Sequence, residues 1–207
     1  MSIDLKIEQS FLTKFYENKS WPDLFGDVTV IMHGKSASGK SMMITQMMAT
    51  YAARALDLDY FVMPYVYKYG NESVKGDLVK MMYTDVLHHC ESAVYDIIET
   101  GTDFPDFVLP ELFTNVRENN RTPILVYIKT SLSIAQIRNG KRIRPVPIEL
   151  IHNQDAQEQN GLFRDICDSY KVPVVEITNE EDIKSMIDNA VDAVDEMIKN
   201  KIVHPKI

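Results

Sequence analysis

The stretch from Gly34 to Ser41 reads Gly-Lys-Ser-Ala-Ser-Gly-Lys-Ser, and it constrains the fold of this chain more than any other feature. It fits the pattern G-x-x-x-x-G-K-[ST], in which a glycine-rich turn joins a buried strand to the start of a helix. An apolar run over residues 28–32 precedes the stretch, and a helical pattern over residues 41–56 follows it. The sequence therefore predicts a strand, a phosphate-binding loop (P-loop) and a helix in this order.

The residues of this loop have the chemistry that a nucleoside triphosphate requires. Gly34 and Gly39 permit a tight turn, because glycine adopts backbone angles that a Cβ atom would penalise. Lys40 is placed to reach the β- and γ-phosphates, and the hydroxyl of Ser41 to bind Mg²⁺, so we expect ATP and Mg²⁺ as cofactors. The expected nucleotide-binding residues are the eight of the loop: Gly34, Lys35, Ser36, Ala37, Ser38, Gly39, Lys40 and Ser41.

The composition is that of an ordinary globular chain. Its 207 residues are 45% hydrophobic and 25% charged, which suits one α/β domain with a sizeable core. The first residues are charged and no run approaches the ~20 apolar residues of a membrane span, so we expect a cytoplasmic protein with no membrane partner. Cys90 and Cys167 are far apart, so a disulfide framework is not expected. The net charge of −8 argues against general attraction to nucleic acid.

Apolar runs alternate with helical patterns along the chain. Strands are expected near residues 27–33, 60–63, 92–98, 123–129 and 172–177. Helices are expected over residues 3–18, 41–56, 77–89, 107–118, 132–139, 148–169 and 179–199. This order predicts a three-layer α/β fold of the P-loop NTPase type, in which a parallel sheet of about five strands carries helices on both faces. We expect residues 1–207 to form a single domain.

A basic segment, Arg138-Asn-Gly-Lys-Arg-Ile-Arg144, follows the fourth expected strand. Phosphoryl transfer spreads negative charge over the equatorial oxygens of the transferred group, and arginine side chains stabilise that charge. We therefore expect Arg138, Arg142 and Arg144 to be catalytic residues of a lid over residues 132–150. The alternative is a basic turn in solvent.

Two carboxylates in or next to the third expected strand are candidates for the metal site and the general base. Asp96 lies in an apolar run, where an ionised group is costly unless it pairs with Mg²⁺ or another cation, so we expect it to hold the metal beside Ser41. Glu99 lies toward the carboxyl end of the strand, where such sheets bind their ligands, and is the expected general base. The alternative for both is a structural role at the strand end, and Asp59 and Asp103 are the next candidates for the base.

Other classes of P-loop protein fit the chain less well. A guanine-specific Asn-Lys-x-Asp motif is absent, because the Asn-Lys pairs at residues 18–19 and 200–201 continue differently. Helicase and motor cores need more chain than follows the loop. A small phosphotransferase needs a nucleotide site, an acceptor pocket and a cationic lid, and the sequence is compatible with all three.

Several segments resemble a known family. Residues 92–101, Ser-Ala-Val-Tyr-Asp-Ile-Ile-Glu-Thr-Gly, resemble the third-strand segment of the polynucleotide-kinase and zeta-toxin group of P-loop kinases. The arginines of residues 138–144, followed by Pro-Val-Pro, are similar to the lid of that group, and residues 172–178 resemble the last strand of nucleoside-monophosphate and related kinases. The resemblance spans residues 27–199 and implies a general-base aspartate just after the second strand. This chain has Met-Pro-Tyr at residues 63–65 instead.

Together these features lead us to expect an ATP- and Mg²⁺-dependent kinase. The expected acceptor is an alcohol or phosphate on a nucleoside, nucleotide, nucleotide sugar or nucleic-acid end, and a homodimer is one possible assembly. Two alternatives remain open. One is a true 5′-polynucleotide kinase, which would need a basic cleft. The other is a nucleotide-binding regulatory or partner-binding ATPase without small-molecule kinase activity.

Overall fold

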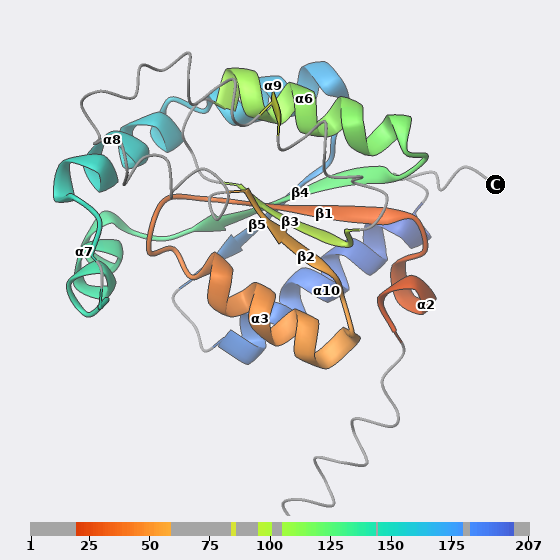
Figure 1. Cartoon of the computed structure of the whole chain (residues 1–207), viewed down its shortest axis with the longest axis horizontal. Helices are drawn as coiled ribbons and strands as arrows, with labels where there is room; N and C mark the ends of the chain where they lie inside the picture. The colour runs from red at the N-terminus through yellow and green to blue at the C-terminus, as the bar shows by residue number, and fades with distance from the viewer. Residues whose placement is uncertain are drawn as a thin grey trace, which may run out of the picture.

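A parallel sheet between two layers of helices forms the body of the molecule (Figure 1). The computed structural model describes residues 20–58, 84–85, 95–100, 105–143, 145–179 and 183–200. The strands within them are β1 (Val28–His33), β2 (Ala55–Asp57), β3 (Ile97–Thr100), β4 (Thr122–Lys129) and β5 (Val174–Thr178). The helices are α2 (Trp21–Phe25), α3 (Lys40–Tyr51), α6 (Pro105–Glu118), α7 (Leu132–Gly140), α8 (Ile148–Gln159), α9 (Leu162–Tyr170) and α10 (Ile183–Lys199).

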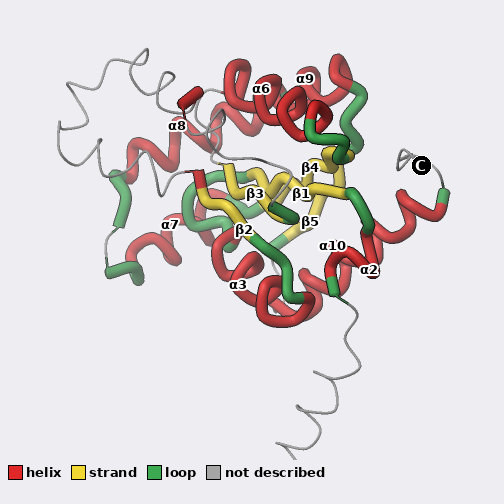
Figure 2. The backbone as a smooth tube through the Cα atoms, turned by 45° about the vertical axis from the view of Figure 1, so that its right-hand side comes forward, coloured by secondary structure: helices red, strands yellow, loops and turns green. Residues whose placement is uncertain are grey.

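The five strands lie in the order β2-β3-β1-β4-β5, and every neighbouring pair is parallel. Helices α6 and α9 cover one face of the sheet, and α3 and α10 cover the other (Figure 1). This architecture confirms the predicted α/β fold. Because parallel strands end at the same edge, the loops that follow β1, β3 and β4 all emerge together. Helices α7 and α8 lie at this end of the molecule in both ribbon views (Figures 1 and 2).

The central strands are apolar throughout because helices cover both of their faces. All six residues of β1 and all four of β3 are buried. Their side chains alternate between two cores. Val30 and Met32 pack with Met43 on the side of α3 and α10, whereas Ile31 packs with Phe113 on the side of α6 and α9.

The second predicted strand and the helix before it differ from the structure. The helix expected over residues 41–56 ends at Tyr51, because Ala52 adopts a left-handed conformation with φ of 52° and caps it. Strand β2 then begins at Ala55, inside the expected helix. The strand predicted over residues 60–63 lies outside the described residues.

Other predicted boundaries shift as well. Strand β3 begins at Ile97, not near residue 92, and continues to Thr100. The single helix expected over residues 148–169 is two helices, α8 and α9, because Gly161 adopts a positive φ of 70° between them. The helix expected over residues 3–18 lies outside the described residues, and only residues 84–85 of the one expected over 77–89 are described.

A buried ion pair fixes the amino edge of the sheet. Asp96, just before β3, accepts hydrogen bonds from the backbone and guanidinium of Arg54, just before β2, and from Arg121, just before β4. Arg121 also donates to the Val28 carbonyl, 2.7 Å away, and to the Thr29 hydroxyl. Asp96 is 1% exposed. Burial alone would raise the pKa of Asp96, but the hydrogen bonds and charges of the two arginines outweigh it and lower that pKa.

We expect Asp96→Asn to reduce the free energy of unfolding near neutral pH by about 3 kcal/mol, because it leaves two arginines without their buried counter-ion. The folded pKa of Asp96 is depressed, so its contribution is present above the unfolded pKa of about 4 and is lost as the pH falls through the folded value. The difference between wild type and variant in urea unfolding should therefore narrow below about pH 4.

Glu176→Gln is the matched control. Glu176 also contacts two basic residues, Lys129 and Arg164, but its side chain is 37% exposed. Glu176→Gln should reduce the free energy of unfolding by less than about 1 kcal/mol. If both variants lose the same free energy of unfolding, the structural role is not specific to Asp96.

Candidate active site

The loop between β1 and α3 has the strained backbone that a P-loop needs. Gly34 and Gly39 have φ values of 149° and 105°. A Cβ atom on Gly34 would lie 2.8 Å from the carbonyl oxygen of Ile128, and one on Gly39 would collide with the side-chain amide of Asn179. Both glycines are therefore required by close packing as well as by their backbone angles.

The carbonyl of Ser38 anchors the middle of the loop. It accepts hydrogen bonds from the Thr130 hydroxyl after β4, from Arg138 on α7 and from the Asn179 amide after β5. Arg138 also donates to the Asn179 side chain, 3.0 Å away. Three elements thus fix the loop from the β4 and β5 side.

The two halves of the loop face different groups. The N–H groups of Lys35 and Ser36 donate to Glu158 and Gln154 of α8, at 2.6 and 2.8 Å. These two residues were predicted to bind nucleotide, but in this structure their N–H groups are already occupied. The first N–H groups of a helix have no partner within that helix, so the start of α3 at Lys40 is suited to bind an anion.

Lys40, Ser41 and Glu99 come together at the carboxyl edge of the sheet. The Ser41 hydroxyl donates to Glu99 Oε1 over 3.0 Å, and Lys40 Nζ lies 3.9 Å from the same oxygen. Lys40 Nζ also donates to the carbonyls of Gly34 and Lys35, at 2.6 and 3.1 Å. Glu99 is 8% exposed and lies opposite Met32 of β1. A cation, a hydroxyl and a carboxylate thus converge beside the N-terminus of α3.

Asp96 does not lie beside Ser41, so the predicted placement of this carboxylate was wrong. It precedes β3 and therefore lies at the amino edge of the sheet, where Arg54 and Arg121 bind it. The P-loop follows β1 at the opposite edge. Each of the three residues directly precedes its strand, which becomes visible only once the strand starts at Ala55, Ile97 and Thr122 are known.

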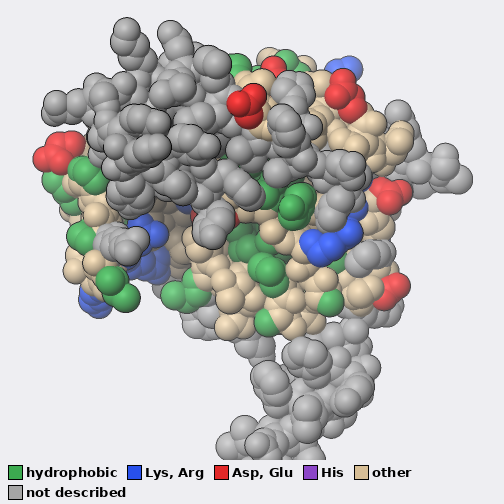
Figure 3. Space-filling view, viewed as in Figure 1, with side chains coloured by type: hydrophobic (Ala, Val, Ile, Leu, Met, Phe, Trp, Pro, Cys, Tyr) green, Lys and Arg blue, Asp and Glu red, His purple; other side chains and the backbone are tan. Residues whose placement is uncertain are grey.

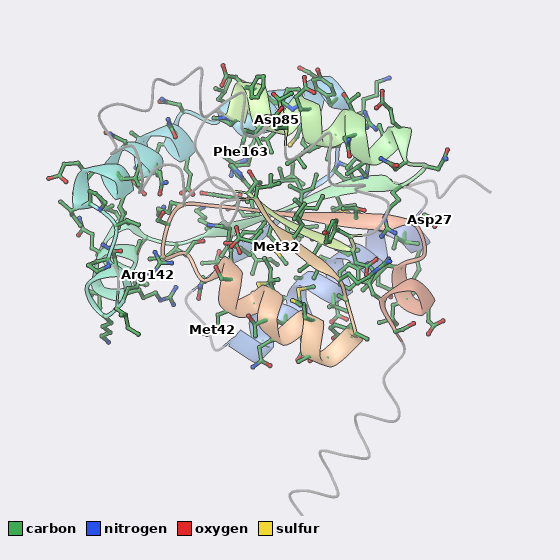
Figure 4. The ribbon with its side chains drawn as sticks, viewed as in Figure 1. Asp27, Met32, Met42, Asp85, Arg142 and Phe163 are labelled. Atoms are coloured by element: carbon green, nitrogen blue, oxygen red, sulfur yellow. The ribbon has the colours of Figure 1, made fainter. Side chains whose placement is uncertain are left out.

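The structure describes two of the three arginines that were predicted to belong to a lid. Arg138 lies against the loop, as described above, and Arg142 is exposed on the segment between α7 and α8. Figure 4 shows Arg142 at the same end of the sheet as Met42, which marks the first turn of α3. Basic side chains gather beside α7 in the space-filling view (Figure 3). Arg144, Asp59 and Asp103 lie outside the described residues.

Comparisons with known proteins agree on the fold. No protein-family model and no curated protein matches the chain. Among solved structures, a gluconokinase from Sinorhizobium meliloti 1021 is similar with a TM-score of 0.62 and 14% identity, covering 84% of this chain and 95% of that one. Shikimate kinase from Acinetobacter baumannii, in complex with shikimate, has a TM-score of 0.58 and 15% identity over 88% of this chain and 99% of its own.

A deoxyadenosine kinase from M. mycoides, with dCMP and dCDP bound, has a TM-score of 0.53 and 15% identity, covering 82% of this chain and all 100% of its own. At these identities the likeness concerns the fold, and the chain has the fold of the P-loop kinases. The closer resemblance to the polynucleotide-kinase and zeta-toxin group stays a prediction. None of the helices in the described part of the chain is both long and apolar enough to cross a membrane.

We expect Gly39→Ala to weaken nucleotide binding by about 10-fold or more, because a Cβ atom there requires both a strained φ and displacement of Asn179. Gly140→Ala is the control, since a Cβ atom on Gly140 meets nothing within 4 Å. Titration with a fluorescent ATP analogue measures both affinities. Unchanged affinity in Gly39→Ala would show that the loop does not bind the nucleotide.

Proposed function

We propose that this chain is an ATP- and Mg²⁺-dependent kinase that transfers the γ-phosphoryl group to a hydroxyl of a small polar molecule. The observation that carries the proposal is the convergence of Lys40, Ser41 and Glu99 beside the N-terminus of α3, with Arg138 bound to the loop from α7. The P-loop kinase fold supports it, and the similar structures include kinases described with small molecules bound.

The residues fit the proposed cofactors. The Ser41 hydroxyl and the Glu99 carboxylate are 3.0 Å apart, and both offer the oxygen ligands that Mg²⁺ prefers, directly or through water. Bound there, the metal would neutralise charge on the phosphates. We therefore assign to Glu99 the metal-ordering role that the sequence had suggested for Asp96.

The cations have separate proposed tasks. Lys40 would exchange its bonds to the Gly34 and Lys35 carbonyls for the β- and γ-phosphates. Arg138, Arg142 and Arg144 would stabilise the charge that develops on the transferred group. With Glu99 assigned to the metal, Asp59 and Asp103 are the next candidates for the general base.

Transfer of radiolabelled γ-phosphate tests the proposal. We expect labelling of at least one member of a panel of sugars, sugar acids, nucleosides, mononucleotides and nucleotide sugars. Lys40→Ala should reduce the transfer by about 10³-fold or more while leaving the fold intact, because a positioned cation is lost. Labelling that survives in Lys40→Ala would point to a contaminating kinase or to a different site.

Oligonucleotides with 5′-hydroxyl ends belong in the same panel. If only they are labelled, the acceptor is a nucleic-acid end and not a small molecule. If nothing is labelled although ATP binds, the chain acts as a nucleotide-binding regulatory or partner-binding ATPase and the kinase proposal is wrong.

We expect Glu99→Gln to raise the Mg²⁺ concentration for half-maximal rate by about 10-fold or more, since residues that order metal ligands typically contribute this much to affinity. Glutamine keeps an acceptor for the Ser41 hydroxyl but removes the charge. Asp96→Asn, checked by circular dichroism for folding at the assay temperature, is the control and should keep the wild-type Mg²⁺ dependence. If Glu99→Gln instead changes the pH–rate profile at unchanged Mg²⁺ dependence, Glu99 is the general base.

A further inference from the structure

The first half of the P-loop is bound to α8 by a buried set of polar contacts. Lys35 Nζ donates to Asp155 and Glu158, at 2.7 and 2.6 Å. The Lys35 N–H donates to the other oxygen of Glu158, and the Ser36 N–H donates to Gln154. Residues 154, 155 and 158 lie on one face of α8, because side chains three and four positions apart are neighbours on a helix. We call this set of contacts the α8 clamp.

The α8 clamp is buried and charged. Lys35 is 2% exposed and Glu158 is 4% exposed. Burial alone would lower the pKa of Lys35, but hydrogen bonds and charges from Asp155 and Glu158 outweigh it and raise that pKa, so the amine stays protonated. Tyr127 of β4 donates to Glu158 over 3.0 Å and ties the carboxylate to the sheet. An apolar pair would fill the same volume without the cost of desolvating charges, so the burial of these charges is not by itself an argument for stability.

Helix α8 belongs to the same unit as the lid. The side-chain amide of Asn139, near the end of α7, exchanges two hydrogen bonds with the backbone of Val146, at 2.8 and 3.0 Å. These bonds close the base of the segment that carries Arg142. Gln136 of α7 and His152 of α8 are 2.9 Å apart. Helix α7, the segment 141–147 and α8 are therefore connected side by side.

This unit contacts the P-loop at two points, residues 35–36 and the Ser38 carbonyl. The α8 clamp holds residues 35–36, and Arg138 of α7 holds the Ser38 carbonyl. Arg142 lies between the two attachments along the chain. The position of Arg142 relative to the loop therefore depends on both attachments, and Arg138 already has an expected role of its own in catalysis.

We propose that Lys35 is a positioning residue that, through Glu158 and α8, sets where Arg142 stands over the phosphates. This inference rests on the proposed kinase function. The side chain of Lys35 contacts only α8 among the contacts described, whereas its carbonyl, which accepts from Lys40, is kept when the side chain is replaced, so a side-chain variant acts on catalysis through α8 and the lid. Its loss should lower the rate of transfer while leaving ATP affinity nearly unchanged, because the phosphate-binding half of the loop keeps its own contacts.

The test is a double-mutant cycle of Lys35→Met and Arg142→Ala, with kcat and the Kd of MgATP measured for each variant. We expect Lys35→Met to lower kcat on the order of 10- to 100-fold, as small misplacements of catalytic groups do. In the Arg142→Ala background the same change should lower kcat far less, because both variants remove the same contribution. Fully additive losses, or a loss in ATP affinity as large as the loss in kcat, would overturn the proposal.

Two further variants serve as a control and as a replacement for Lys35→Met. Lys199→Met removes a lysine from an exposed ion pair with Asp195 on α10 and should keep the wild-type kcat. If Lys35→Met does not fold, Asp155→Asn replaces it, since its side chain is 14% exposed and asparagine preserves the shape of the clamp. We expect a smaller loss of kcat in Asp155→Asn, again with little change in the Kd of MgATP. A wild-type kcat in Asp155→Asn would then refute the proposal.

A measurement that does not depend on phosphoryl transfer can test the positioning role of Lys35 separately from the proposed kinase activity. Hydrogen–deuterium exchange of residues 132–147 is measured with and without a non-hydrolysable ATP analogue and Mg²⁺. We expect the analogue to protect this segment in wild type and to protect it less in Lys35→Met, although it still binds. If wild type transfers no phosphate but shows this difference, the kinase proposal fails and the positioning of the lid by Lys35 stands. Equal protection in both proteins would refute the positioning role.

Discussion

The parallel pairing of β1 with β3 on one side and β4 on the other is the constraint on which the candidate site depends. It places the P-loop, Glu99 and the start of α7 at one edge of the sheet, although they are far apart in the sequence. The same pairing places Arg54, Asp96 and Arg121 together at the other edge. At the amino edge the charges of Arg54, Asp96 and Arg121 pair with one another, whereas the carboxyl edge carries the groups of the candidate site.

Sequence reasoning succeeded where the signal was local. The P-loop pattern, with its apolar strand before it and its helix after it, defines β1, the loop and α3, and the alternation of apolar and helical segments defines the parallel fold. It failed at Asp96 because an apolar run does not reveal which of its residues begins the strand. The strand was expected to begin near residue 92, but β3 begins at Ile97, so Asp96 lies at the amino edge of the sheet while Glu99 lies at the carboxyl edge, as expected.

The α8 clamp could not be read from the sequence for a different reason. Lys35 and Glu158 are 123 positions apart, and a lysine within a P-loop pattern indicates a phosphate contact more readily than an ion pair with a helix. Contacts of this range follow from the packing of the whole domain, which a local pattern does not encode.

Lys40 donates hydrogen bonds to the carbonyls of Gly34 and Lys35, and these bonds would compete with a ligand for the lysine. A ligand must replace two neutral dipoles that are covalently attached and therefore present at a high effective concentration. Only a group with a concentrated negative charge gains enough from the lysine to displace them. A nucleoside without phosphates would gain nothing from this exchange, so a loop of this kind would select for phosphorylated ligands before any contact with the base is made.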